Sequence, residues 1–316
     1  MKPLLSIVVP VYNRASLVVR TLDSIAASKR GDFHLIVVDN GSTDGSLAAC
    51  ERWAAAHRDD VFTVEVTQEL RAGAPAARNT GLARVTTPFV YFFDSDDLFS
   101  PTFTETVIPT LATTEADLLF VPVNQVEANG TSHVRSYMEK ASPAVHILSS
   151  MLSTQSMVFR TEWLRSMGAW NEQITIWQDW ELGTRALLAH PRMAWLTDEA
   201  YHAVMIHPES ISGQSMAHTW AQSVHTMECA LRDVMELTSS QDEKQNAVRA
   251  LYLRARILMG LIGRKQFHQG VETYSQFLTQ RVPRQPMFVR LLGRVLQTYT
   301  RMGGRGAWRM ALYAVK

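Results

Sequence analysis

FVYFFDSDDL, residues 89–98, joins a run of five apolar residues to three carboxylates that lie within four positions. An uninterrupted apolar run predicts a strand that is buried on both faces, as strands of parallel sheets are. Asp94, Asp96 and Asp97, here called the carboxylate cluster, follow that strand at once, and like charges this close raise one another's pKa. The stretch therefore predicts that a cation or hydrogen-bonding partners lie among them.

Similar apolar runs alternate with helical patterns through the first third of the chain. The sequence predicts strands over residues 4–12, 34–39, 62–66 and 89–94. It predicts helices over 15–28, 43–57 and 75–84, with Ser42 as N-cap of the second and Pro75 in the first turn of the third. This alternation is typical of an α/β fold with a parallel sheet.

The rest of the sequence predicts a different organisation. Residues 117–138 read as two strands joined around Asn129-Gly130, followed by a helix near 177–190 and a strand near 194–206. From Met216 onward the pattern is wholly helical. We therefore expect one domain over residues 1–215 and a helical region over 216–316.

Composition limits the class of protein. With 46% hydrophobic and 19% charged residues, the chain is typical of a soluble globular protein. The run over residues 4–12 is too short to span a bilayer and lacks a small-residue cleavage site, so it indicates a strand and not a signal peptide. Cys50 and Cys229 are far apart without CxxC spacing, which fits a reducing compartment. We expect a cytoplasmic protein.

Charge is concentrated at the end of the chain. Residues 273–316 hold eight Lys or Arg and no Asp or Glu. Within 287–302, one predicted helix face carries Phe288, Leu291, Leu292, Val295, Tyr299 and Met302, and the other carries Arg290, Arg294, Gln297 and Arg301. Residues 283–316 then either lie on an anionic membrane, with Trp308 and Tyr313 at the interface, or pack on the catalytic domain with the arginines in solvent. No nucleic-acid partner is expected.

Polar residues crowd the carboxyl ends of the predicted strands. Asn13 and Arg14 follow the first strand, Asp39 and Asn40 the second, and the carboxylate cluster the fourth. Ligands of open α/β sheets bind beyond these ends, so one cleft is expected to collect them. Neither GxGxxG nor GxxxxGK[ST] follows any predicted strand, which disfavours a dinucleotide or P-loop site.

Six ordered segments carry a resemblance to a known family: SIVVPVYNR (6–14), VVDNGSTDGS (37–46), AGAPAARNTGL (72–82), YFFDSDD (91–97), WQDWELGTR (177–185) and HPESIS (207–212). In this order they resemble the family 2 glycosyltransferases, whose GT-A fold binds nucleotide sugars. The resemblance implies a Rossmann-like, mostly parallel sheet flanked by helices over 1–215, with a C-terminal helical extension over 216–316. It implies an inverting glycosyltransferase that uses a nucleoside-diphosphate sugar, with a UDP-sugar favoured. The acceptor hydroxyl would belong to a carbohydrate or a lipid-linked acceptor, in the assembly of a surface polysaccharide or glycolipid. Such an enzyme would be cytoplasmic, either free or peripheral on the inner face of the membrane.

The resemblance also assigns donor-binding residues. Asp39 would hydrogen-bond the base, although the DNGSTDG composition also predicts an Asx turn there. Arg78 would face the diphosphate, and the alternative is a solvated helical arginine. The donor site would also contain Pro10, Tyr12 and Arg14 around the base, Asp94 nearer the ribose, and Ser95.

The same resemblance places a divalent cation at the carboxylate cluster. Asp96 would bind Mn²⁺ or Mg²⁺ directly, with Asp97 as a second ligand and His207 on the metal or the leaving diphosphate. Carboxylate oxygens suit such hard cations, which offset charge on the leaving group. The alternative is that Asp96 or Asp97 caps a helix that starts near Pro101.

Asp179 in WQDWEL is the predicted general base, because the acceptor hydroxyl needs a carboxylate to take its proton. Members of the family commonly have Glu-Asp where this chain has Gln178-Asp179. Glu181 is the alternative base, and an ordinary helix-initiating acid is the other interpretation of Asp179.

Two further functions stay open from sequence. A non-catalytic nucleotide-sugar-binding or scaffold module would keep the fold without transfer. A haloacid-dehalogenase phosphatase also begins with a strand that ends in DxD, but its motif lies on the first strand, and Leu98 stands where that family has Thr or Val. Donor hydrolysis or transfer, compared with donor binding alone, separates an enzyme from a binding module.

Overall fold

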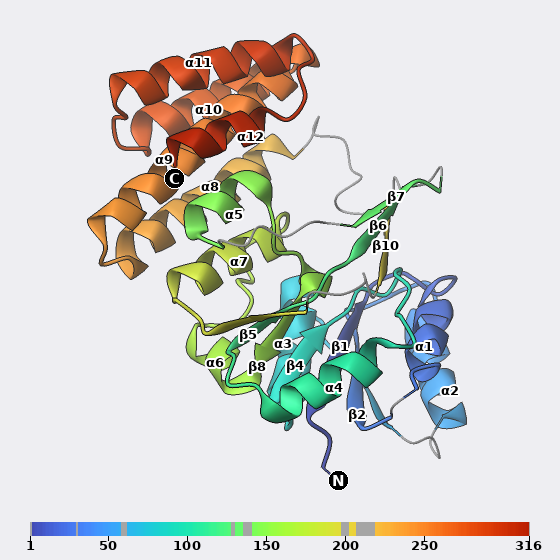
Figure 1. Ribbon diagram of the computed structural model, residues 1–316. Coiled ribbons are helices and arrows are strands. Elements are labelled where there is room, and N and C mark those ends of the chain that lie inside the picture. Colours follow the sequence, from blue (N-terminus) through green and yellow to red (C-terminus); the bar gives the residue numbers. More distant parts are fainter. Residues whose placement is uncertain are drawn as a thin grey trace. The chain divides into compact units, whose positions relative to one another are not determined.

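A computed structural model describes residues 2–29, 31–57, 62–127, 130–134, 141–196, 202–206 and 219–315 (Figure 1). The chain divides into two compact units. The sheet unit comprises Met1–Tyr137, Ser153–Thr175 and Pro191–His207, and the helical unit comprises Met138–Leu152, Ile176–His190 and Pro208–Lys316. The helical unit thus takes three stretches of the range expected as one domain, 138–152, 176–190 and 208–215.

The described part of the sheet unit contains a seven-stranded sheet in the order β3-β2-β1-β4-β8-β5-β9. Its strands are β1 (Leu5–Val11), β2 (Phe33–Asp39), β3 (Thr63–Gln68), β4 (Phe89–Phe92), β5 (Leu118–Phe120), β8 (Met157–Arg160) and β9 (Met193–Trp195). β8 runs antiparallel to β4 and β5, while β1, β2, β3 and β4 are mutually parallel. The predicted mostly parallel α/β sheet is confirmed.

The central strands form because both of their faces are apolar. Every residue of β1 is buried, as is every residue of β4, and β2 has one partly exposed residue, His34. The sheet is flanked by α1 (Val18–Ala26), α2 (Ser46–Ala56), α3 (Ala74–Arg84), α4 (Phe103–Thr113) and α6 (Thr161–Ser166). The predicted early helices are therefore present, with Pro75 in the first turn of α3.

Two predicted details of the sheet unit are wrong. Ser42 does not cap α2, because Gly45 at φ 90° lies between them and the Ser42 hydroxyl accepts the Asn13 N–H instead. The single strand near 194–206 is two strands, since β9 belongs to the large sheet and β10 (Ala203–Ile206) to a separate one of order β10-β6-β7.

The predicted hairpin is confirmed, but the first of the two strands predicted over residues 117–138 is divided into β5 of the large sheet and β6 of the small one. β6 (Asn124–Glu127) and β7 (Ser132–Val134) pair antiparallel in the small sheet. Asn129 of the expected turn lies outside the described residues, and Gly130 has the positive φ of 82° that such a turn favours. The short 3-10 helix η1 (Thr154–Ser156) leads into β8.

The helical unit is built around α9 (Gln241–Arg264), which packs against α5, α8, α10 and α11 (Figure 1). Its other helices are α5 (Pro143–Ser149), α7 (Gln178–Leu188), α8 (Trp220–Leu237), α10 (His268–Gln280), α11 (Met287–Arg301) and α12 (Ala307–Ala311), with η3 (Leu312–Ala314). The predicted helical character after Met216 is confirmed over residues 219–315. Within the described ranges, no helix has both the length and the apolar character needed to cross a bilayer.

Close packing of α3 on the sheet generates the first prediction. A Cβ added at Gly81 would overlap a methyl group of Val8 and crowd Val38. We expect Gly81→Ala to lower the free energy of unfolding by about 1–3 kcal/mol, the usual cost of overpacking a core. Urea titration of the variant and the wild type measures this difference in the free energy of unfolding.

The matched control is Gly263→Ala on α9, where the added Cβ would meet Val271 at an ordinary 3.5 Å. That substitution should leave stability unchanged or raise it by about 1 kcal/mol, because alanine is the better helix former. Equal stability of Gly81→Ala and the wild type would show that α3 is free to move away from β1.

Candidate functional site

The site begins where three parallel strands end. β1 pairs with β2 so that Val11 lies opposite Asp39, and with β4 so that Val8 lies opposite Phe92. The segments that follow these strands therefore leave the sheet at the same edge. The polar residues predicted to share a cleft come from these segments.

Asp94 is held between a cation and an amide. Its Oδ1 accepts a hydrogen bond from Arg78 Nη2 at 2.8 Å, and its Oδ2 accepts one from Gln155 Nε2 at 2.8 Å. Arg78 is buried, with its guanidinium carbon 4.4 Å from the centre of the Trp170 ring. The alternative of a solvated arginine is therefore wrong.

Asp97 is an internal member of the cluster. Its Oδ1 accepts the Met205 N–H at 2.8 Å, and its Oδ2 accepts from Gln155 Nε2 at 2.5 Å. Burial, and then the nearby Asp94 charge, raise the pKa of Asp97 well above its ordinary value. One amide nitrogen, with its two hydrogens, thus serves two carboxylates.

Asp96 lies nearer to solvent than Asp97. Its Oδ2 is 3.4 Å from Arg14 Nε, and its side chain is 16% exposed. The Arg14 N–H donates to the Ser46 hydroxyl at 2.8 Å, which joins the segment after β1 to the start of α2. Arginine therefore faces both Asp94 and Asp96.

Neither aspartate of the capping alternative caps a helix. α4 begins at Phe103 with Thr102 at its N-cap, and that cap has no side-chain hydrogen bond. The capping explanation is wrong. Within the sheet unit, Arg14 and Arg78 form ion pairs with Asp96 and Asp94, and the Gln155 amide donates hydrogen bonds to Asp94 and Asp97.

Asp39 is a completely buried carboxylate, and its two oxygens differ in their hydrogen bonding. Oδ2 accepts the Ser42 N–H at 3.1 Å and Gln68 Nε2 at 3.2 Å, so a turn-stabilising role is confirmed. Oδ1 has no hydrogen-bond partner among the described residues. A buried acceptor left unsatisfied is costly, and a donor group from a ligand would remove that cost.

The other residues of the predicted donor site differ in exposure. Pro10 is buried within β1, whereas Tyr12, two residues later, is 58% exposed. Ser95 is buried, and its backbone carbonyl accepts a hydrogen bond from Thr21 Oγ1 at 2.9 Å. Tyr12 and Arg14 are thus more accessible to a ligand than Pro10 and Ser95.

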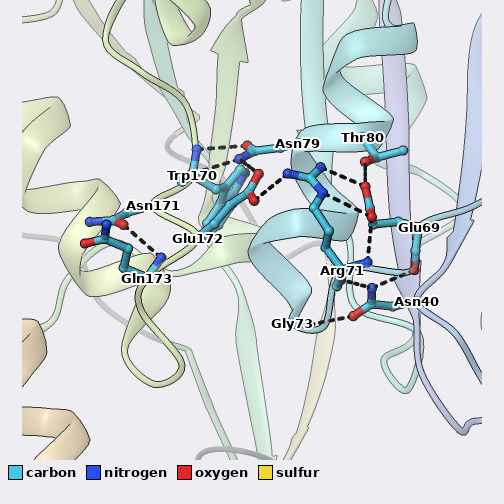
Figure 2. Close-up of polar contacts among 10 residues, drawn as sticks. All are labelled: Asn40, Glu69, Arg71, Gly73, Asn79, Thr80, Trp170, Asn171, Glu172 and Gln173. Carbon is cyan, nitrogen blue, oxygen red and sulfur yellow. Dashed lines mark hydrogen bonds and ion pairs between the residues drawn. The ribbon is translucent and has the colours of Figure 1, made fainter.

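Asn40 fastens the loop before α3 to the end of β2 (Figure 2). Its Nδ2 donates to the carbonyls of Glu69 at 2.9 Å and Arg71 at 2.7 Å, and its Oδ1 accepts the Gly73 N–H at 2.8 Å. Gly73 directly precedes α3, the helix that carries Arg78. Asn40 therefore links the position of Arg78 to that of Asp39.

A second polar network, formed by more exposed side chains, supports the same loop before α3 (Figure 2). Arg71 bridges Glu69 and Glu172, at 2.7 Å to each carboxylate. Hydrogen bonds from the Arg71 and Thr80 side chains lower the pKa of Glu69 to about 2. Asn79 Nδ2 also donates to Glu172, at 2.9 Å, so α3 and the segment after Trp170 are joined.

The predicted base belongs to the helical unit. Asp179 lies in the first turn of α7, and its Oδ1 accepts the Trp180 N–H at 2.9 Å. Trp177 before it has a left-handed φ of 55°. His207 lies outside the described residues, so its predicted role is unchanged.

Glu181, the alternative base, is committed elsewhere. It is 1% exposed and pairs with Arg185 at 2.5 Å. Burial, and then the Glu181 charge, raise the pKa of the neighbouring Asp233 to about 6. A buried, paired carboxylate is a poor proton acceptor for an outside hydroxyl, which favours Asp179.

Sequence reasoning missed Gln155, Trp170 and the role of Asn40. Asn40 stands at a predicted strand end, and that position was a usable signal. Gln155 and Trp170 lie in no motif, and only folding brings them to the carboxylate cluster and to Arg78.

Gln155 generates a prediction with a pH signature. Gln155→Met removes the donors shared by Asp94 and Asp97, so we expect about 1–3 kcal/mol less unfolding free energy at pH 8. The variant raises the pKa of Asp97 further, and a raised carboxyl pKa costs stability as pH rises. The loss should therefore be smaller at pH 5, as measured by urea unfolding.

Gln173→Met, at an exposed residue of the same unit, is the control and should behave as the wild type. If Gln155→Met lost the same unfolding free energy at both pH values, the amide would fill space without stabilising the charged form of Asp97.

Comparisons with known proteins agree with this geometry. The family model described as glycosyl transferase family 2 matches residues 6–168. Glycosyltransferase GlyA of Streptococcus pneumoniae is 32% identical over 158 residues, which are 48% of this chain and 22% of that protein. The poly(ribitol-phosphate) beta-N-acetylglucosaminyltransferase TarS of Staphylococcus aureus is 26% identical over 205 residues, 62% of this chain and 35% of that protein. The chain thus spans well under half the length of these relatives.

Solved structures share the fold of the whole chain. The crystal structure of S. aureus TarS 1–349 in complex with UDP-GlcNAc has a TM-score of 0.75 and 20% identity, covering 99% of this chain and 91% of that one. The mannosyltransferase PcManGT from Pyrobaculum calidifontis, in complex with GDP-Man and Mn²⁺, has a TM-score of 0.57 and 16% identity, covering 99% and 87%. The family match covers more than half of the chain and the fold is that of a GT-A enzyme, so this chain belongs to glycosyl transferase family 2.

Proposed function

We propose that this chain is an inverting glycosyltransferase that moves a sugar from a nucleoside-diphosphate sugar to an acceptor hydroxyl in the assembly of a surface polysaccharide or glycolipid. The observation that carries the proposal is a buried Asp39 oxygen without a partner among the described residues, at the sheet edge that also holds the carboxylate cluster. Family membership supplies the class of reaction.

The nucleotide base is the donor group that fits Asp39. An ionised carboxylate only accepts hydrogen bonds, so it selects a base that presents a ring N–H. Uracil and guanine have such a group. UDP-GlcNAc and GDP-Man are the ligands named for the two similar structures, and a UDP-sugar is favoured because TarS has the higher TM-score.

Arg14 and Arg78 are the cations that we propose for the diphosphate. Both contact the carboxylate cluster, Arg14 at Asp96 and Arg78 at Asp94. Guanidinium groups suit phosphate because they donate two parallel hydrogen bonds. As the glycosidic bond breaks and charge builds on the diphosphate, these arginines would stabilise it.

The cluster also fits a divalent cation. Among the described residues, no three His, Cys, Asp or Glu side chains are arranged to hold a metal alone. Mg²⁺, however, is usually bound by one or two carboxylates together with substrate phosphates. Asp96, whose side chain is 16% exposed, fits that pattern as the direct ligand.

Asp97 and His207 complete the proposed metal site less directly. Both Asp97 oxygens already accept hydrogen bonds from the protein, so Asp97 would need to exchange one of them to act as a ligand. His207 keeps its proposed role at the metal or the diphosphate by family resemblance. Bound Mn²⁺ or Mg²⁺ would supply Lewis-acid stabilisation of the leaving diphosphate.

Asp179 would accept the proton of the acceptor hydroxyl. The hydroxyl oxygen attacks the anomeric carbon from the face opposite the diphosphate, the bond to the diphosphate breaks, and configuration inverts. A position in the first turn of α7 stabilises the carboxylate form, because the helix N-terminus carries partial positive charge. A carboxylate in this position can accept the proton of the hydroxyl.

The name of one relative supports the proposed acceptor, and the proposed location rests on the family resemblance alone. TarS is named for a poly(ribitol-phosphate) acceptor. We accordingly propose a carbohydrate or lipid-linked acceptor for this chain, reached from the cytoplasmic side, with peripheral attachment to the inner face of the membrane. The haloacid-dehalogenase alternative has lost its basis, because the chain belongs to another family.

A nucleotide-sugar screen tests the proposed function. Each sugar nucleotide is added with Mn²⁺ and the melting temperature is measured, since a ligand that binds the folded state raises it by mass action. The best ligand is then assayed for release of the nucleoside diphosphate. A UDP-sugar should give the largest shift and should be hydrolysed or transferred, whereas binding without turnover would support the non-catalytic module.

The carboxylate cluster gives one prediction. Asp96→Ala should abolish the Mn²⁺-dependent part of donor binding and cost several kcal/mol of transition-state stabilisation, on the order of 10³-fold in kcat/KM. Glu162→Ala, at an exposed residue of α6, is the control and should keep full activity. A mutant with unchanged activity and Mn²⁺ response would remove the metal assignment.

The proposed base, Asp179, gives another prediction. Asp179→Asn should lower kcat roughly 10²–10⁴-fold while donor affinity stays nearly constant, because a base acts on the acceptor. Asp242→Asn changes an acid in the first turn of α9 and controls for helix stability. Equal loss of donor affinity in Asp179→Asn would show that this residue shapes the donor pocket instead.

A further inference from the structure

α11 packs through one narrow face. Val289, Gly293, Leu296 and Thr300 are its buried residues, and they recur at the three- and four-residue spacing of one side of a helix. α11 lies along the outer edge of the helical unit and packs against α9 (Figure 1). The apolar face that the sequence predicted for this helix lies on a different side.

The orientation of α11 is locked by two glycines. A Cβ at Gly293 would meet the Tyr252 ring at 2.8 Å, and one at Gly260 of α9 would overlap Thr300. Thr300 Oγ1 also donates to the Ile257 carbonyl at 3.2 Å. α11 therefore cannot rotate without separating two closely packed backbones.

A second face of α11 leaves large apolar side chains in solvent. These residues, here called the apolar stripe, share one side of the helix: Phe288 (55% exposed), Leu291 (50%), Val295 (57%), Tyr299 (39%) and Met302 (82%). Leu292, which the sequence placed with them, is partly buried against the core. The helix packs on α9 of the helical unit and still presents an apolar surface, so the membrane alternative stays a prediction.

A basic row runs beside the apolar stripe. Arg290, Arg294 and Arg301 recur along the third side of α11, and residues 273–316 contain no acidic side chain. Within the described part of the chain, none of these three arginines forms a salt bridge. Contiguous exposed apolar residues on a monomer mark an interaction surface.

We propose that the apolar stripe and basic row of α11 bind an anionic lipid surface. An amphipathic helix of this kind lies in the plane of the interface, with its apolar side chains at the acyl boundary and its arginines on lipid phosphates. A second copy of this chain is a poorer occupant, because a twofold contact would bring like-charged rows together. The partner that satisfies both surfaces is a membrane with negative headgroups.

This inference deepens the peripheral attachment in the proposed function by naming the surface that makes it, and it rests on residues that take no part in the proposed transfer reaction. The full chain is mixed with vesicles of phosphatidylcholine that contain from zero to 40 mole per cent phosphatidylglycerol, on the order of cellular anionic content, and bound protein is measured by co-sedimentation. Binding should rise with phosphatidylglycerol and fall with added salt, because exposed charges are screened.

Two sets of variants test the two surfaces. Arg290→Gln, Arg294→Gln and Arg301→Gln together should lower the partition coefficient roughly 100-fold, since each basic residue contributes about fivefold. Phe288→Ser with Val295→Ser should also weaken binding. Met235→Ser with Leu237→Ser removes exposed apolar residues from α8 and should bind as the wild type.

Melting temperature and nucleotide-sugar binding are measured on every variant. Both should stay at wild-type values because the changed side chains are exposed, apart from Arg290, which is partly exposed. No binding of the wild type to the anionic vesicles at low salt would overturn the proposal. So would binding that the arginine variant leaves unchanged. An oligomer that only the serine variant of α11 dissociates, without vesicle binding, would assign the stripe to contact between copies. Failure of donor turnover in the nucleotide-sugar screen would leave the vesicle result unaffected.

Discussion

The pairing of β1 with β2 on one side and β4 on the other is the constraint on which the site depends. Because these strands are parallel and in register, the segments that follow them leave the sheet at the same edge, where the strands have their carboxyl ends. A buried carboxylate at the end of β2, an arginine after β1 and the carboxylate cluster after β4 are thereby brought to one edge of the sheet. Without this register, none of the proposed donor contacts could form.

Concentrated negative charge is the second constraint, and the sheet unit meets it by hydrogen bonding. Arg78 and Gln155 hold Asp94, while Gln155 and the Met205 N–H hold Asp97. Asp96 is left as the member that faces Arg14 and solvent. The cluster is therefore organised before a ligand arrives, which reduces the cost of ordering a site on binding.

In the helical unit, close packing of α11 on α9 leaves large apolar side chains exposed. Glycines at 260 and 293 let α9 and α11 approach closely, so a narrow face suffices to hold α11. Its larger apolar residues then remain outside, beside arginines that no acid in residues 273–316 can pair. α7, with the proposed base Asp179, belongs to this unit and not to the sheet unit.

The sequence by itself determined the class of fold and the residue types of the site. Apolar runs buried on both faces are visible as uninterrupted stretches, and Asp39, Asp94 and Asp96 stand where those runs stop. It could not determine that Gln155 bridges two carboxylates 58 and 61 residues away, or that residues 194–206 divide between two sheets. Nor could helical spacing show which side of α11 is buried, because Val289 and Leu296 are no more apolar than Leu291 and Val295. Those outcomes depend on contacts between distant segments, and only the tertiary structure decides which side chains such contacts cover.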